Sequence, residues 1–428
     1  MNNLIRGVGF WGQRLGAWLS GNCRRIGLIA CMAVNGMGMA ANHAGHGSSQ
    51  PHDKDKVWKA AISRQPLAVA ATLDGSGKLW KASVKDGHVM VSYSEDQGKT
   101  YSTPVLVNSE PELVAAIGEN RPKIVVDANG NIYVSYTQNL EAGFAGHVRF
   151  SRSVDGGKSF SPPITVNNNL DPITHSFDVM GVNGRGQIYI AWIDKRDTSI
   201  AKRNGEKFKG AAIYYAISDD GGKTFHPNIK AADHSCECCR IAMAIDKDGT
   251  PVIVWRNIFS SNIRDHAMMR LDGSSQPIRL SNENWEVDAC PHHGPAVSIA
   301  NDNNYHFVWF SNSPERRGLF YSYSSDQGKH FSHPLNFGNF KAQASHPHVL
   351  SMGQRVFIVW KEFDGMATGI HLIYSFDGGK IWSSPQKIAS TNGTSDYPFL
   401  ASDGKHVYLA WNSDMEGFRF ISVSEVVQ

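Results

Sequence analysis

Short apolar segments recur along most of the chain, and turns rich in glycine, asparagine and aspartate separate them. A typical repeat holds an inner apolar strand, a second strand that ends in an aromatic residue, and a third strand. Segments of this length bounded by such turns predict β-strands, and a spacing of 51 to 65 residues is typical of a propeller or a solenoid. The second segments end at Ser83, Tyr136, Trp192, Trp255, Trp309, Trp360 and Trp411.

Seven inner strands match these seven second strands, and they begin near Leu67, Lys123, Asp178, Ile241, Ala296, His348 and Phe399. The last repeat provides three strands, and residues 57–62 supply an apolar strand that would complete it. A blade built from both ends of the chain closes the ring and removes sheet edges. We therefore predict an all-β fold, a seven-bladed β-propeller of four-stranded antiparallel blades closed by an N-terminal strand. Six blades is the alternative if the first or last repeat is misassigned.

An octapeptide of the form Ser-x-Asp-x-Gly-Lys-x-aromatic follows the third strand in five repeats. Its serine and aspartate side chains suit hydrogen bonds to the turn backbone, and its glycine supplies a positive φ. In the fourth repeat, residues 270–274 stand where the octapeptide is expected, which explains why one interval is 106 residues long. The aspartates of the five copies are Asp96, Asp155, Asp220, Asp326 and Asp377.

The octapeptide resembles the Asp box of the sialidase-like, or BNR-repeat, proteins. Five copies make the resemblance specific for the fold, and it extends over nearly the whole chain after residue 41. The resemblance implies a β-propeller and says little about activity, because Asp boxes lie in structural hairpins. Sialidases proper have six blades, so seven repeats favour a member of this group that is not a sialidase.

The N-terminal region is predicted to direct export. Residues 1–41 carry arginines, no acidic residue, a short apolar run and small residues up to Ala41, as in a signal peptide. A lipobox-like sequence ends at Cys31, but the apolar stretch before it is short, so we do not expect a lipid anchor there. Residues 42–55 are expected to form a flexible arm containing histidines, and residues 56–428 a single propeller domain, periplasmic or extracellular.

Charge and hydropathy exclude two classes of partner. Loss of the four arginines of the leader changes the formal net charge from +3 to −1, which gives no electrostatic case for nucleic-acid binding. No apolar run reaches the roughly 18 residues of a membrane span. The expected ligand is therefore a metal ion, a small molecule or a glycan at the mouth of the central channel, where propeller loops converge.

The strand order predicts which residues reach that mouth. In a propeller the inner strand of each blade starts on the face where the second strand ends, so the loops before inner strands ring one opening. The octapeptide turns lie on the opposite face. Thiol, imidazole and charged groups are concentrated in the loops before the inner strands, which indicates a functional site.

Cysteine and histidine clusters precede three successive inner strands. Thiolates select copper(I) or zinc(II), and imidazoles suit both metals. We expect a metal site that serves metal binding, homeostasis or a metal-dependent reaction, with copper favoured over zinc because Met268, Met269 and His266 lie nearby in sequence. The predicted ligands are Cys236, Cys238, Cys239, Cys290, His292, His293, His346 and His348.

Disulfides are the main alternative, because four cysteines in an exported chain commonly pair. Cys236 or Cys239 would join Cys290 across neighbouring blades, or Cys238 and Cys239 would form a vicinal disulfide. The protein would then be a disulfide-stabilised scaffold that binds a protein or a glycan. A further interpretation is that the thiols are reduced and serve in redox or catalytic chemistry.

The resemblance to sialidases implies a third function, glycoside hydrolysis of the exo-sialidase type. These enzymes bind a sugar carboxylate with three arginines, and they use a tyrosine backed by a glutamate as nucleophile and an aspartate as acid/base. The arginine of Arg121-Pro122 only approximates the family's Arg-Ile-Pro segment, and inter-blade salt bridges are an alternative role for all three arginines. The candidates are Arg121, Arg240, Arg256, Tyr397, Glu362 and Asp194, with Glu416 and Asp197 as alternatives for the last two.

Overall fold

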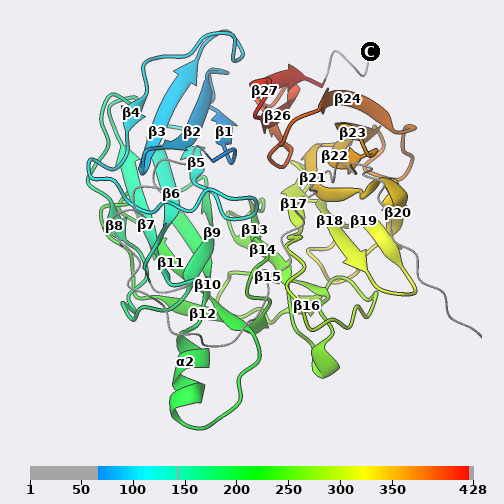
Figure 1. The fold of residues 1–428 in the computed structure, drawn as a ribbon, viewed down its shortest axis with the longest axis horizontal. Coiled ribbons are helices and arrows are strands. Elements are labelled where there is room, and N and C mark those ends of the chain that lie inside the picture. Colours follow the sequence, from blue (N-terminus) through cyan, green and yellow to red (C-terminus); the bar gives the residue numbers. More distant parts are fainter. Residues whose placement is uncertain (1–65, 142–143, 424–428) are drawn as a thin grey trace, which may run out of the picture. The chain divides into compact units, whose positions relative to one another are not determined.

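The computed structural model describes residues 66–141 and 144–423, which all belong to one compact unit. Seven antiparallel sheets form a seven-bladed β-propeller, six of them with four strands and the last with three (Figure 1). The predicted fold class and number of blades are confirmed. The expected signal peptide (1–41), arm (42–55) and closing strand (57–62) lie outside the described residues.

Each blade is built from consecutive strands, from the inner to the outer edge. Blade 1 contains β1 (Ala70–Leu73), β2 (Leu79–Lys85), β3 (His88–Ser94) and β4 (Val105–Leu106), and blade 2 contains β5 (Lys123–Val126), β6 (Ile132–Asn139), β7 (Gly146–Ser153) and β8 (Ile164–Thr165). Blade 3 contains β9 (His175–Val182), β10 (Ile188–Asp194), β11 (Ala211–Ser218) and β12 (Ile229–Ser235), and blade 4 contains β13 (Ala242–Ile245), β14 (Pro251–Arg256), β15 (His266–Arg270) and β16 (Ile278–Arg279).

The remaining blades follow the same order. Blade 5 contains β17 (Ala296–Ile299), β18 (Tyr305–Asn312), β19 (Arg317–Ser324) and β20 (Leu335–Phe337). Blade 6 contains β21 (Ser345–Met352), β22 (Arg355–Phe363), β23 (Thr368–Ser375) and β24 (Gln386–Thr391), and blade 7 contains β25 (Phe399–Ser402), β26 (Val407–Ser413) and β27 (Gly417–Ser422). Helix α2 (Arg196–Arg203) and two short 3₁₀ turns (Ser260–Asn262 and Phe340–Ala342) lie in connections.

Two inner strands begin earlier than predicted. β9 starts at His175 rather than near Asp178, and β21 starts at Ser345 rather than near His348. The pairing register of both strands shifts close to these starts. His346 has a φ of 51°, so a β-bulge changes the direction of the backbone where β21 enters the sheet.

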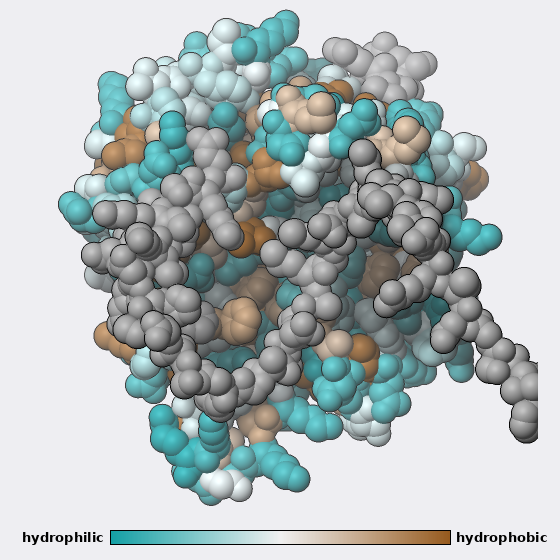
Figure 2. All heavy atoms as spheres, viewed as in Figure 1, coloured by the Kyte–Doolittle hydropathy of each residue, from teal (hydrophilic) through white to brown (hydrophobic). Residues whose placement is uncertain are grey.

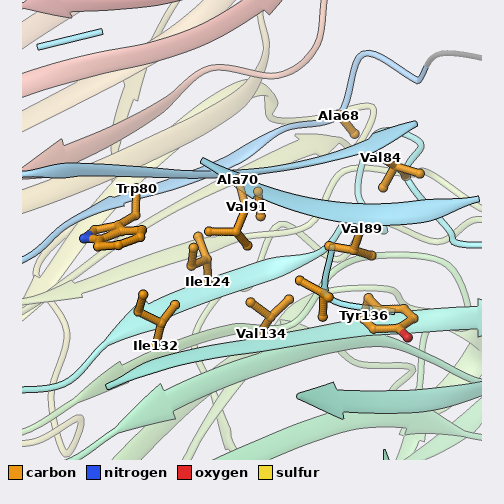
Figure 3. Packing of buried hydrophobic residues seen from close by; sticks show 13 residues of the cluster. Ala68, Ala70, Trp80, Val84, Val89, Val91, Ile124, Ile132, Val134 and Tyr136 are labelled. Atoms are coloured by element: carbon orange, nitrogen blue, oxygen red, sulfur yellow. The ribbon is translucent and has the colours of Figure 1, made fainter. Parts of the chain in front are cut away.

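The second strands form the core because their side chains are buried on both faces. The tryptophans of β10, β14, β18, β22 and β26 are at most 1% exposed. Side chains of adjacent sheets interlock between them, and this apolar burial is the main source of stability. Figure 3 shows the packing between blades 1 and 2, where Trp80 and Val91 face Ile124, Ile132 and Val134.

The octapeptide turns join third to fourth strands, as predicted, and their hydrogen bonds repeat. In blade 2 the Ser153 hydroxyl donates to Asp155 at 2.7 Å and accepts from the Gly157 amide at 2.9 Å. The other four copies contain the same two bonds. Blade 4 keeps a shorter version, in which Asp272 accepts from the amides of Ser274 and Ser275. The blade-to-blade loops therefore lie on the opposite face.

The visible surface is mostly hydrophilic, with hydrophobic side chains scattered over it (Figure 2). Within the described ranges, no helix combines the length and apolar character needed to cross a membrane.

Candidate metal centre

Two loops on successive blades carry the cysteines. Residues 236–240 connect β12 to β13, and residues 290–293 connect β16 to β17 (Figure 1). The first loop is anchored at its start, where the Cys236 amide donates to the Arg256 carbonyl at 2.8 Å. It is anchored at its end, where the Arg240 amide donates to the Glu119 carboxylate at 3.0 Å. Both loops lie opposite the octapeptide turns, on the face that the strand order predicted.

The structure brings the sulfur atoms of the two loops together. Cys236 Sγ lies 3.8 Å from Cys238 Sγ and 3.8 Å from Cys239 Sγ. These three sulfurs form a buried group whose members all lie within 4.8 Å of one another. A second group of the same size contains Cys238, Cys290 and His292, and its last two members are exposed. Five of the eight predicted ligands thus converge.

The sulfur separations suit a shared metal ion. All four cysteines in the described part of the chain are free, so the disulfides considered as an alternative are not formed there. A disulfide bond is about 2.0 Å long, whereas sulfurs arranged tetrahedrally around one ion at about 2.3 Å lie about 3.8 Å apart. The donor set of thiols and an imidazole fits copper(I) or zinc(II).

Two buried arginines balance the charge of this cluster. Arg264 Nη1 donates to Cys236 Sγ at 3.2 Å, and the Arg256 guanidinium adds a second positive charge nearby. Hydrogen bonds from Cys238 and Cys239, and then these charges, lower the pKa of the Cys236 thiol well below its usual value. Burial raises the pKa of the Cys239 thiol, so the metal-free cluster concentrates its negative charge on Cys236.

The other three predicted ligands lie elsewhere. His293 stacks between Phe310 and His346, with ring centroids 4.1 and 4.4 Å apart, and His346 stacks on Tyr397 at 3.4 Å. His346 Nδ1 is 3.2 Å from the Glu119 carboxylate. The half-buried His348 ring accepts from the Leu400 amide at 3.2 Å. Among the described residues, His293, His346 and His348 therefore belong to neither group of converging ligands, whereas the other five predicted ligands do.

The three arginines of the sialidase interpretation all donate to protein oxygens. Arg121 forms a bidentate pair with Asp396 at 2.6 and 2.8 Å. Arg240 donates to Glu119 and to two backbone carbonyls, and Arg256 donates to three backbone carbonyls. These guanidinium groups join different blades at the mouth.

The other candidates for glycoside hydrolysis are spread over several blades. Asp194 accepts from the Trp192 indole at 2.8 Å, and Glu362 accepts from the Trp360 indole at 2.7 Å. Both acids are thus partners of core tryptophans two residues earlier in the same strand. Burial raises the pKa of Tyr397 to about 12, and the negative charges of Glu119 and Asp396 add to the shift.

Sequence reasoning missed Glu119 and Arg264. Glu119 precedes the second inner strand and Arg264 follows the fourth second strand, so the face rule that selected the cysteines covers both positions. Their positions in the loops could therefore have placed both residues at the mouth. Their contacts could not be predicted in the same way, because Glu119 pairs with Arg240, 121 residues away, and Arg264 donates to Cys236, 28 residues away.

The fold resembles solved propellers that act on or bind carbohydrates. No family model and no curated protein sequence matches the chain. A lectin, BP39L from Burkholderia pseudomallei, has a TM-score of 0.53 at 12% identity, covering 84% of this chain and 99% of its own. An ulvan lyase of polysaccharide lyase family PL25 has a TM-score of 0.52 at 10% identity, covering 84% and 93%.

The solved structures that are similar to this chain also include a sialidase. The Hadza microbial sialidase Hz136 has a TM-score of 0.48 at 15% identity, covering 78% of this chain and 73% of its own. At such identities the similarity concerns the fold alone. The chain is a β-propeller with a cysteine and histidine cluster in the loops between its blades.

Proposed function

We propose that this protein binds a soft metal ion at the cysteine cluster, copper(I) in preference to zinc(II), and acts in metal binding or homeostasis. The observation that carries the proposal is the group of three buried sulfurs, Cys236, Cys238 and Cys239, within 4.8 Å of one another. Thiolates are the ligands that select these two metals. The sulfurs of Cys236 lie 3.8 Å from those of Cys238 and Cys239, a separation that suits ligands of one ion and is too long for a disulfide.

Two features favour copper. Structural zinc sites are almost always four-coordinate, whereas the buried group supplies three sulfurs, and the next buried neighbour of Cys236 is the Arg264 guanidinium, which cannot act as a ligand. Copper(I) also leaves three thiolates with one more negative charge than zinc(II) does. Arg264 and Arg256 are buried beside the cluster and offset that charge.

The cellular setting is part of the proposal. The composition of residues 1–41 supports export to the periplasm or the outside. In an oxidising compartment, four thiols would ordinarily pair, and a bound metal ion would protect them from oxidation. The proposed protein therefore acquires its ion before the thiols are oxidised, or receives it from another exported protein.

An anaerobic titration with copper(I) against a competing chelator tests the proposal. We expect stoichiometric binding and retention of the ion against a chelator that removes loosely bound copper. Cys239→Ser should weaken binding by more than the about 10–100-fold that loss of an outer-shell partner costs. Met366→Leu, which removes an exposed sulfur from the loop after β22, is the matched control and should leave binding unchanged. Absence of stoichiometric binding, or an unaffected Cys239→Ser protein, would contradict the proposal.

A further inference from the structure

The two ligand groups share one sulfur atom. Cys236, Cys238 and Cys239 form the inner triad, and Cys238, Cys290 and His292 form the outer triad. Two ligands of one ion, each bonded at about 2.3 Å, lie no further apart than about 4.6 Å. The donor atoms of each triad lie within 4.8 Å of one another, which is close to this limit, so a small adjustment of the side chains gives each triad the dimensions of one coordination sphere.

We infer that the centre holds two copper(I) ions, one in each triad, with the Cys238 thiolate bridging them. The inference rests on the proposed function and adds the stoichiometry and the roles of the two positions. A thiolate sulfur has enough lone pairs to bond to two ions. The thiols release their protons to solvent as the ions bind.

Charge favours the second ion. With one copper(I), the four thiolates leave more negative charge than the two neighbouring arginines, Arg264 and Arg256, can offset. A second monovalent ion removes one of these charges from a site that is largely buried. Since uncompensated charge in the interior is costly, the half-filled cluster should bind the second ion readily.

The two positions differ in access. Cys236, Cys238 and Cys239 are all buried, at 1, 7 and 2% exposure, whereas Cys290 and His292 are exposed. An ion therefore reaches the outer triad first. There it already contacts Cys238, so it can move to the inner triad by exchanging ligands without leaving the protein. The outer position is the exchange site and the inner position is the retention site.

Arg264 fixes the outer loop relative to the inner one. Its guanidinium donates to Cys236 Sγ and, through Nε, to the Val287 carbonyl at 2.9 Å. His292 has a φ of 54°, a left-handed conformation that costs free energy for a non-glycine residue. In this conformation a ring nitrogen of His292 lies within 4.8 Å of the Cys290 sulfur.

A comparison of the full chain with a variant lacking the outer triad tests the inference. Cys290→Ser/His292→Asn removes both exposed ligands, and asparagine tolerates the positive φ at position 292. Anaerobic copper(I) titration should give two equivalents for the unaltered protein and one for the variant. X-ray absorption should detect a copper neighbour of copper only in the unaltered protein. Circular dichroism confirms that the variant is folded.

The outcomes separate this inference from the proposed function. No bound copper in the unaltered protein contradicts the proposed function itself. One equivalent in both proteins leaves the proposed function intact and overturns the two-ion cluster. Two equivalents without a copper neighbour, or two equivalents retained by the variant, also overturn it, because the ions would then not share Cys238.

Discussion

The buried Glu119 and the partly buried Arg240 form an ion pair at the channel mouth, with 2.7 Å between their charged atoms and a separation of 121 residues in sequence. Glu119 belongs to the connection between β4 and β5, and Arg240 is the last residue of the first cysteine loop. The same carboxylate accepts from the Gly294 amide at 2.6 Å and lies 3.2 Å from His346 Nδ1. One acidic side chain therefore joins the loops that lead into blades 4, 5 and 6, including both loops of the metal centre.

Glu119→Gln should destabilise the fold. The substitution removes the charged partner of the Arg240 guanidinium. Since the Arg240 side chain is 20% exposed, we expect a loss below the about 3–5 kcal/mol that is typical of a fully buried pair. Urea denaturation would measure the loss as a lower midpoint. Glu110→Gln, at an exposed position in the same connection, is the control and should change the stability little. Equal midpoints for the two variants would show that the pair contributes nothing.

Acid should weaken the same contact. Burial opposes ionisation of Glu119, but Arg240 and the His346 hydrogen bond outweigh it and lower the pKa of Glu119 well below its usual value. A carboxyl group with a lower pKa in the folded state contributes stability above its unfolded pKa of about 4.5 and loses it as the pH falls further. The stability of the unaltered protein should drop below pH 4.5 more steeply than that of Glu119→Gln.

Gly294→Ala should disturb the metal loop through the same carboxylate. A Cβ atom at this position would overlap Arg240 Cγ and nearly reach Glu119 Oε2, and the Arg240 backbone leaves little room for it to move. We expect a loss of about 1–3 kcal/mol from overpacking and weaker copper binding, because residues 290–293 would shift. Gly184→Ala, with open space around its Cβ and no positive φ, is the matched control. A Gly294→Ala protein as stable as the control would contradict the model of a tightly packed mouth.

The fold could be predicted because one feature recurs in every blade. In blades 2 to 7 the second strand is buried on both faces for most of its length, so it is largely apolar and carries a buried aromatic residue such as Trp192 or Trp411 near its end. The number of blades follows from the regular spacing of these residues along the sequence. The predicted starts of three inner strands, at Lys123, Ala296 and Phe399, agree with the structure to the residue.

The candidate site was predictable only in part, for a geometric reason. Strand order determines on which face a loop lies, so Cys238 and Cys290 could be assigned to neighbouring loops. It does not determine the direction of a side chain within a loop. His346 lies in a bulge and stacks on Tyr397, and Glu119 pairs with Arg240 across the mouth. Such contacts depend on loop conformations that no local pattern in the sequence specifies.

Lys123 should make stability rise with pH in alkaline solution. Burial lowers the pKa of Lys123 to about 8, with Asp178 opposing the shift. Since the folded pKa lies below the unfolded value of 10.5, the penalty is complete below pH 8 and is relieved as the pH rises to 10.5. At about 1.4 kcal/mol for each pKa unit, the gain is about 3 kcal/mol.

The variant that tests this prediction is Lys123→Met, in which the side chain at position 123 cannot titrate. Denaturation at several pH values between 8 and 10.5 should show that the unaltered protein gains stability relative to this variant. Lys85→Met removes an exposed lysine and should keep the pH dependence of the unaltered protein. Parallel curves for the unaltered and Lys123→Met proteins would mean that this amine titrates normally.

Arg264→Gln should weaken copper binding without emptying the site. The guanidinium is not a ligand, but it donates to Cys236 Sγ and carries one of the positive charges that offset the thiolates. Loss of an outer-shell partner of this kind typically costs about 10–100-fold in metal affinity. A chelator-competition titration measures the change, and the number of bound ions should stay the same. Arg317→Gln, an exposed arginine on blade 5, should bind copper like the unaltered protein. If Arg264→Gln bound copper as tightly as that control, the charge argument for a monovalent ion would lose its support.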